Sequence, residues 1–178
     1  MTVIHANDPT TRFLSLLYEQ RGDISVHITE ADNKSAVQRA IRGDDVIMML
    51  GHGDPGGLYS VPSSPGRFPR LLVDSGFVQF LRGKTCIGIW CFANEFAEKY
   101  HLHGLFSGMI ISELDEAMMC EVNATKEEID LEMVKFTQRL RYCIDRYGLK
   151  ETPVRMKELD DVKSELTTFN YNNLYYFE

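Results

Sequence analysis

The sequence predicts an α/β protein, a three-layer α/β/α sandwich with a mainly parallel central sheet. Uninterrupted apolar stretches such as Val46–Leu50 and Thr85–Trp90 are typical of strands that are buried on both faces. Segments with helical spacing of apolar residues separate these stretches, as expected of a parallel sheet covered by helices. A length of 178 residues is enough for one core and too short for two ordinary enzyme domains, so we expect one domain over residues 1–178.

The first half of the chain alternates between extended and helical patterns. The expected order before Val46 is a strand over Thr2–His5, a helix over Thr10–Gln20, a strand over Ile24–Thr29 and a helix over Lys34–Ile41. Asn7, Asp8 and Pro9 open the first of these helices, and Gly43 closes the second. Val46–Leu50 and Thr85–Trp90 are then expected to be adjacent central strands.

The second half contains one more apolar stretch and one strongly patterned helix. Met109–Ile111 predicts a further strand of the parallel sheet. Thr125 and Glu128 form a capping box that begins a helix ending at Gly148, and Cys143 lies on its apolar stripe. We therefore expect Cys143 to be buried. The remaining segments predict a helix over Pro153–Thr167 and an extended segment over Phe169–Phe177.

The composition excludes several classes of partner. A formal net charge of −7 argues against nucleic acid or an anionic membrane, because both need clustered Lys and Arg. No apolar segment reaches the length that a bilayer requires, and the N-terminus lacks a secretory pattern. The four cysteines include no C-x-x-C pair, so free thiols and a cytoplasmic location are expected.

Two strand ends carry residues that suggest chemistry. Ligands of open parallel sheets bind beyond the carboxyl ends of the strands, where His52 and Cys91 stand. His52 begins a loop that turns tightly over Asp54–Gly57, and the helix expected after Cys91 would lower the pKa of its thiol. With the N–H groups of Gly53 and Cys91 as oxyanion donors, these residues outline a cysteine hydrolase.

The segment Val46–Tyr59 resembles the histidine segment of caspases, in which an apolar strand and a small residue precede His-Gly. Two residues, Gly, one residue and an aliphatic-aromatic pair follow there and here. Cys91 stands where the caspase-like clan, which includes gingipain-like, clostripain-like and separase-like peptidases, carries its nucleophile. The resemblance covers roughly residues 1–117. It implies a distant member of this clan that hydrolyses peptide bonds through a dyad of His52 and Cys91.

The residues around Cys91 depart from the caspase pattern. Ile89-Trp90 and Phe92-Ala93 replace the Gln-Ala and Gly-containing flanks of caspases, so cleavage after aspartate is not implied. Ser112-Glu113 resembles a Ser-Glu pair of the clostripain-like subgroup. Because these residues follow the expected strand Met109–Ile111, we expect Glu113 and Asp115 at the same rim, accepting a Lys or Arg side chain of a peptide or protein substrate.

Other interpretations remain open. A catalytically silent scaffold that binds a protein partner would keep this fold and lose the pocket. A flavodoxin-like phosphate binder would use the loop Gly51–Gly57, but this loop matches neither the dinucleotide nor the P-loop motif. His101 and His103, with Glu98 before them, suggest a metal site. The two histidines fall on one face only in a strand and no fourth ligand stands nearby, so we expect no metal and no cofactor. The sequence does not predict the oligomeric state.

Overall fold

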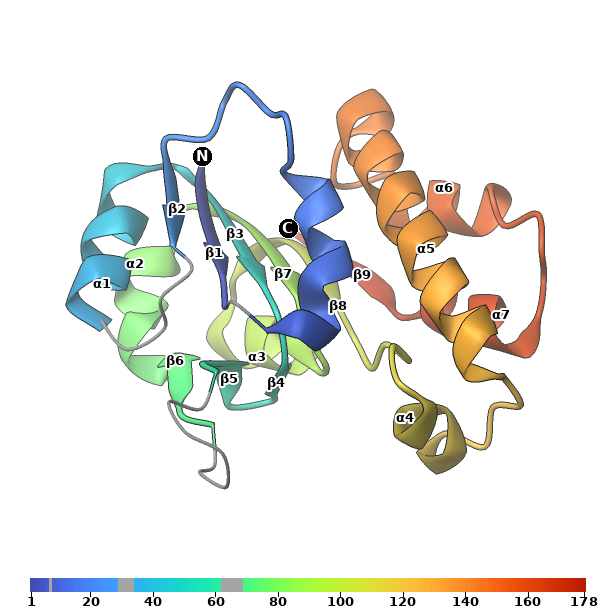
Figure 1. Ribbon diagram of the computed structural model, residues 1–178. Helices are drawn as coiled ribbons and strands as arrows, with labels where there is room; N and C mark the ends of the chain where they lie inside the picture. Colours follow the sequence, from blue (N-terminus) through green and yellow to red (C-terminus); the bar gives the residue numbers. More distant parts are fainter. Residues whose placement is uncertain (7, 29–33, 62–68) are drawn as a thin grey trace.

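The computed structural model describes residues 1–6, 8–28, 34–61 and 69–178. Its centre is a six-stranded sheet in the order β2-β1-β3-β7-β8-β9 (Figure 1). The strands are β1 (Thr2–His5), β2 (Val26–Ile28), β3 (Val46–Leu50), β7 (Thr85–Ile89), β8 (His103–Ser107) and β9 (Leu174–Phe177). Only β9 is antiparallel to its neighbour, so the predicted α/β class with a mainly parallel sheet is confirmed.

The two strands that were expected at the centre are neighbours. β3 and β7 pair in parallel, with Val46 opposite Thr85 and Leu50 opposite Ile89. A small antiparallel sheet of β4 (Gly53–Asp54), β5 (Gly57–Tyr59) and β6 (Leu71–Val73) follows β3. The tight turn predicted after His52 is the connection between β4 and β5.

Helices cover both faces of the large sheet (Figure 1). They are the 3-10 helices η1 (Pro9–Leu17) and η2 (Ser75–Phe77) and the α-helices α1 (Lys34–Gly43), α2 (Val78–Leu81), α3 (Ala93–Tyr100), α4 (Leu114–Met119), α5 (Lys126–Tyr147), α6 (Thr152–Glu158) and α7 (Glu165–Asn172). The two predicted helices before β3 are therefore present, the first of them as a 3-10 helix. Asn7 and Thr29 lie outside the described residues.

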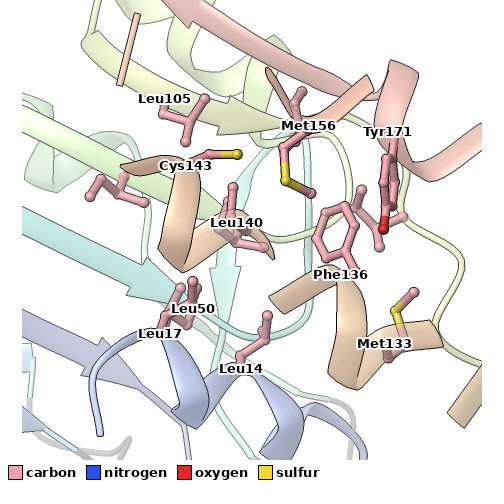
Figure 2. Packing of buried hydrophobic residues seen from close by; sticks show 14 of the residues in the cluster. Leu14, Leu17, Leu50, Leu105, Met133, Phe136, Leu140, Cys143, Met156 and Tyr171 are labelled. Carbon is pink, nitrogen blue, oxygen red and sulfur yellow. The ribbon is translucent and has the colours of Figure 1, made fainter. Parts of the chain in front are cut away.

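Alternation along the strands builds two separate cores. In β3, Met48 and Leu50 point to the face covered by η1, α5, α6 and α7, whereas Ile47 and Met49 point to the face covered by α1, α2 and α3. Figure 2 shows the first core, where Phe136, Leu140 and Cys143 of α5 meet residues of the sheet. Because β3 is buried on both faces, its sequence is continuously apolar.

The long helix α5 begins and packs as predicted. Glu128 Oε2 accepts the backbone N–H of Thr125 at 2.8 Å, and the Thr125 hydroxyl accepts the N–H of Glu128 at 3.3 Å. Cys143 is fully buried on the face that packs against the sheet, which confirms its place in the core. No helix among the described residues is long and apolar enough to cross a membrane.

The strand predicted at Met109–Ile111 was wrong, and the fourth parallel strand is β8 instead. The backbone of Ile111 pairs with a side chain: its N–H donates to Asn170 Oδ1 at 2.8 Å, and its carbonyl accepts from Asn170 Nδ2 at 3.0 Å. Asn170 thus occupies the hydrogen-bonding groups that a neighbouring strand would otherwise use. The apolar character of the segment reflects burial without pairing in a sheet.

The single helix predicted over Pro153–Thr167 was also wrong, because α6 and α7 are separate helices. The break is at Asp160, whose carboxylate accepts the backbone N–H groups of Val162 and Lys163, both at 3.0 Å. Its second oxygen accepts the hydroxyl of Thr167 at 2.7 Å. The extended segment predicted over Phe169–Phe177 is confined to β9, since α7 continues to Asn172.

Candidate functional site

A cleft of about 510 Å³ opens at the carboxyl edge of the parallel strands. Its described lining comes from the segments that follow β1, β3, β7 and β8, from the end of β5 and the residues beside it, from Pro69 before β6, and from α4. His52 and Cys91 both line this cleft, and both also line a smaller cavity of about 20 Å³ that reaches Phe136 in the core. The strand order changes direction between β1 and β3, which is where open α/β sheets bind ligands.

His52 is held from two sides. Its backbone carbonyl accepts the N–H of Tyr59 at 2.8 Å, which ties it to the β4-β5 hairpin. Its ring Nε2 lies 2.6 Å from the hydroxyl oxygen of Thr10 and 3.9 Å from Asp8 Oδ2. Asp8 was predicted only to open a helix, and Thr10 was not predicted to lie at the site. No signal in the sequence indicated this contact, because it depends on the pairing of β1 with β3.

The hairpin after His52 rests on Trp90. The indole Nε1 of Trp90 donates to the carbonyl of Asp54 at 3.2 Å, and the Trp90 side chain is buried. A Cβ atom at Gly53 would lie 2.2 Å from Trp90 Cδ1, so only glycine fits there without a shift. Trp90, the residue before Cys91, therefore holds the loop that carries His52. The assignment of the N–H groups of Gly53 and Cys91 as oxyanion donors stays a prediction.

Cys91 is half-buried at the floor of the cleft. Its Sγ lies 3.7 Å from the carbonyl oxygen of Ile110 and 3.9 Å from Glu116 Oε1. Burial, with the negative charge of Glu116, raises the pKa of the Cys91 thiol to about 11. The expectation that a helix N-terminus lowers this pKa was wrong. Burial is the larger effect, and Phe92, in the left-handed conformation with φ of 67°, separates the thiol from the first turn of α3.

The carboxylate beside Cys91 belongs to Glu116, which was not among the residues predicted for the site. Glu116 Oε2 accepts the N–H of Ser112 at 2.7 Å, the hydroxyl of Ser112 at 3.0 Å and the N–H of Glu113 at 3.0 Å. These three donors leave Oε1 directed at the Cys91 sulfur. Glu116 follows Glu113 by three positions, which is the capping-box spacing, and this spacing was the available signal.

Glu113 and Asp115 lie in a different position from the one expected. Both are exposed and stand at the start of α4. Among the described residues that line the cleft, neither is present, whereas Glu116 is. The strand end that was expected to place them at the rim, Met109–Ile111, does not form. Their contact with a substrate stays a prediction.

Cys86, Cys143 and His103 lie away from the cleft, whereas Cys120 lies near Cys91 and Glu116. Cys86 points to the opposite face of the sheet from the α5 core, and burial raises its pKa to about 12. Cys120 is half-buried near the end of α4. His103 Nε2 faces the hydroxyl of Tyr176 at 3.0 Å. Within the described part of the chain, no group of three or more His, Cys, Asp or Glu side chains could hold a metal ion.

No protein-family model matches this sequence, and no curated protein is significantly similar to it. The resemblance to the caspase-like clan therefore stays a hypothesis that depends on the residues themselves. These are the His-Gly segment after β3 and the cysteine after β7, which the fold brings to one cleft.

Proposed function

We propose that the chain is a caspase-like cysteine peptidase, a distant member of that clan, which hydrolyses peptide bonds through His52 and Cys91. The observation that carries the proposal is that both side chains line one cleft at the ends of the adjacent parallel strands β3 and β7. The four cysteines are free, which suits a reducing compartment such as the cytoplasm.

The proposed reaction proceeds in two halves. The proton of the Cys91 thiol passes to His52 as the sulfur attacks the substrate carbonyl carbon, and the N–H groups of Gly53 and Cys91 stabilise the oxyanion. His52 then protonates the leaving amine as the C–N bond breaks, leaving a thioester on Cys91. Water then attacks the thioester carbonyl and gives a proton to His52. The C–S bond breaks, the carboxylic acid product leaves, and His52 returns the proton to the Cys91 sulfur.

The raised pKa of Cys91 fits a resting enzyme with a neutral thiol. A pKa of about 11 means that few molecules carry a thiolate at neutral pH. Deprotonation must therefore accompany substrate binding and attack. The cleft supports this order, because it offers apolar surface from Phe92, Met109 and Met119 against which a peptide can pack and exclude water.

The charges in the cleft favour a basic side chain in the substrate. Its charged lining residues are the carboxylates Asp8 and Glu116, and the described lining contains no Lys or Arg. Glu113 and Asp115 add two further carboxylates at the exposed start of α4. We propose a preference for Lys or Arg side chains, with Glu116 next to the scissile bond and Glu113 and Asp115 farther out.

A positional library of fluorogenic peptides tests the peptidase. We expect hydrolysis by the wild-type protein and its loss in Cys91→Ala and in His52→Gln. Cys120→Ser is the matched control, because it removes another half-buried thiol and is expected to retain activity. Unchanged hydrolysis in Cys91→Ala, or none by a folded wild-type protein, would contradict the proposal.

One observation favours a second candidate, a catalytically silent scaffold that binds a protein partner. The Cys91 thiol is protonated at neutral pH, and the carboxylate of Glu116 beside it opposes a thiolate. Peptides would then bind in the cleft and remain intact.

A further inference from the structure

We propose that Asp8 and Thr10 are positioning residues for His52, acting as a two-residue relay that fixes its ring and stabilises its charged form. The inference deepens the proposed function and rests on it for its role in catalysis. The placement itself rests on three distances: 2.6 Å from His52 Nε2 to Thr10 Oγ1, 2.9 Å from Thr10 Oγ1 to Asp8 Oδ1, and 3.9 Å from His52 Nε2 to Asp8 Oδ2.

The direction of the hydrogen bonds follows from the chemistry of the groups. An ionised carboxylate only accepts, so the single hydroxyl proton of Thr10 is donated to Asp8 Oδ1. The hydroxyl oxygen then has only lone pairs to offer His52, which must donate from Nε2. This fixes the Nε2–H tautomer and leaves Nδ1, which has no hydrogen-bond partner among the described residues, to exchange protons in the cleft.

The relay is built into the start of η1. Asp8 caps this helix by accepting the backbone N–H of Thr10 at 2.9 Å, so the carboxylate has a fixed position before it meets the hydroxyl. Thr10 follows as the second residue of η1, whose buried residues Leu14 and Leu17 anchor the helix in the core. The position of His52 is thus set by β1 and η1 as well as by its own loop.

The relay has a function in both halves of the proposed reaction. When Nδ1 takes the Cys91 proton, the ring becomes a cation, and the Asp8 carboxylate stabilises it through Thr10. When the ring gives that proton to the leaving amine, the fixed tautomer keeps Nδ1 as the atom that delivers it. No proton leaves Asp8 or Thr10 in this scheme, so both remain positioning residues.

Three variants separate the hydroxyl, the charge and the helix cap. Thr10→Val removes the hydroxyl at nearly constant shape, and loss of a hydrogen bond to a charged ring predicts about a tenfold fall in kcat with little change in KM. Thr10→Ser restores the hydroxyl and is expected to restore kcat. Asp8→Asn keeps a good helix cap and removes the charge. The Coulomb energy between Asp8 and a charged His52 at 3.9 Å in water predicts about a fivefold fall in kcat.

The control variant is Thr125→Val. It makes the same substitution at an exposed helix start outside the cleft, where the hydroxyl serves only the helix cap. We expect lower stability and wild-type kcat. A fall in kcat equal to that of Thr10→Val would show that lost stability, and not a lost contact with His52, causes the effect, and it would overturn the inference.

A second measurement does not require activity. Long-range ¹H–¹⁵N NMR spectra of the wild-type protein, with the His52 signal assigned from its loss in His52→Gln, should show a protonated Nε2 and an unprotonated Nδ1. In Thr10→Val the two nitrogen shifts should approach each other as the tautomers mix, and in Thr10→Ser they should not. A wild-type ring with its proton on Nδ1, or shifts unchanged by Thr10→Val, overturns the relay.

The two readouts distinguish failure of the relay from failure of the peptidase. If the wild-type protein hydrolyses no peptide and the NMR signature is present, the proposed function is wrong and the orientation of His52 by Asp8 and Thr10 stands. If hydrolysis depends on Cys91 and His52 but Thr10→Val leaves both kcat and the ring shifts unchanged, the relay is wrong and the peptidase stands.

Discussion

Replacing Gly53 with Ala tests how tightly the hairpin after His52 is fitted to the residue before Cys91. The new methyl group would lie 2.2 Å from Trp90 Cδ1, 2.8 Å from Trp90 Cγ and 2.4 Å from the carbonyl oxygen of Gly57. None of these neighbours is the flexible end of a side chain. The hairpin must therefore move away from Trp90, or the indole must leave its place in the core.

The expected loss of stability follows from these contacts. Overpacking of a filled site costs about 1–3 kcal/mol. Movement of the hairpin also breaks the hydrogen bond from Trp90 Nε1 to the carbonyl of Asp54, which is worth about 1 kcal/mol. We expect the free energy of unfolding of Gly53→Ala to fall by about 2–4 kcal/mol. For the proposed peptidase, a displacement of His52 by about 1 Å would in addition lower kcat about a hundredfold.

Urea denaturation followed by tryptophan fluorescence measures the first effect, since Trp90 is the single tryptophan of the chain. Gly43→Ala is the matched control. An added methyl group at the last residue of α1 meets open space, so its free energy of unfolding should stay equal or rise by up to about 1 kcal/mol. If Gly53→Ala unfolds at the same urea concentration as the wild-type protein, the contact between the hairpin and Trp90 is not as tight as described.

Three further predictions concern stability. Burial raises the pKa of Cys86 to about 12 and that of Cys91 to about 11. The stability that comes from keeping these thiols neutral is therefore complete below about pH 9 and is lost as the pH rises toward 11–12. A urea midpoint that stays constant as the pH is raised from about 9 to about 12 would contradict this. Asn170→Leu leaves the N–H and carbonyl of Ile111 without partners and should lower the free energy of unfolding by about 2–4 kcal/mol, measured by urea denaturation; a smaller loss than 1 kcal/mol would mean that water replaces the amide. Thr125→Ala should cost about 1 kcal/mol in a thermal melt through loss of the α5 cap, and an unchanged melting temperature would refute that role.

The sequence predicts the centre of the fold well because the two central strands are buried on both faces. β8 escaped prediction for a physical reason. It contains Gly104, with φ of 133°, where a Cβ atom would lie 1.9 Å from the carbonyl oxygen of Cys86 on the neighbouring strand. Only glycine avoids this clash with the neighbouring strand, and a glycine weakens the apolar pattern by which a strand is predicted. Met109–Ile111 shows the reverse case, an apolar stretch whose backbone is satisfied by the Asn170 side chain.

The candidate site divides in the same way. His52 and Cys91 were predictable, because each follows a recognisable strand and parallel strands end at one edge of the sheet. Asp8, Thr10 and Glu116 were not, since their proximity depends on which loops meet beyond that edge. Asp8 and Thr10 reach His52 because β1 lies beside β3, and Glu116 reaches Cys91 because α4 turns its first turn toward the cleft.

The position of Glu116 connects substrate preference to reactivity. Its carboxylate raises the pKa of the Cys91 thiol, and a Lys or Arg side chain bound beside it would neutralise that charge. If the proposed peptidase is correct, a basic substrate should therefore lower the pKa of the thiol that attacks it, whereas a neutral one should not. We expect arginine amide to accelerate alkylation of Cys91 by iodoacetamide at pH 8, and norleucine amide, which has no charged side chain, to leave it unchanged.

Glu116→Gln removes the negative charge, which is one of the causes of the raised pKa of Cys91, and leaves burial as the main cause. The pKa of the thiol should therefore fall, and alkylation of Cys91 should be faster without any ligand. It should also abolish the acceleration by arginine amide. Glu127→Gln is the control, since its side chain is exposed in the first turn of α5 and outside the described lining of the cleft. If arginine amide accelerates alkylation equally in the wild-type protein and in Glu116→Gln, the cation binds elsewhere, and Glu116 determines neither the reactivity of the thiol nor the choice of substrate.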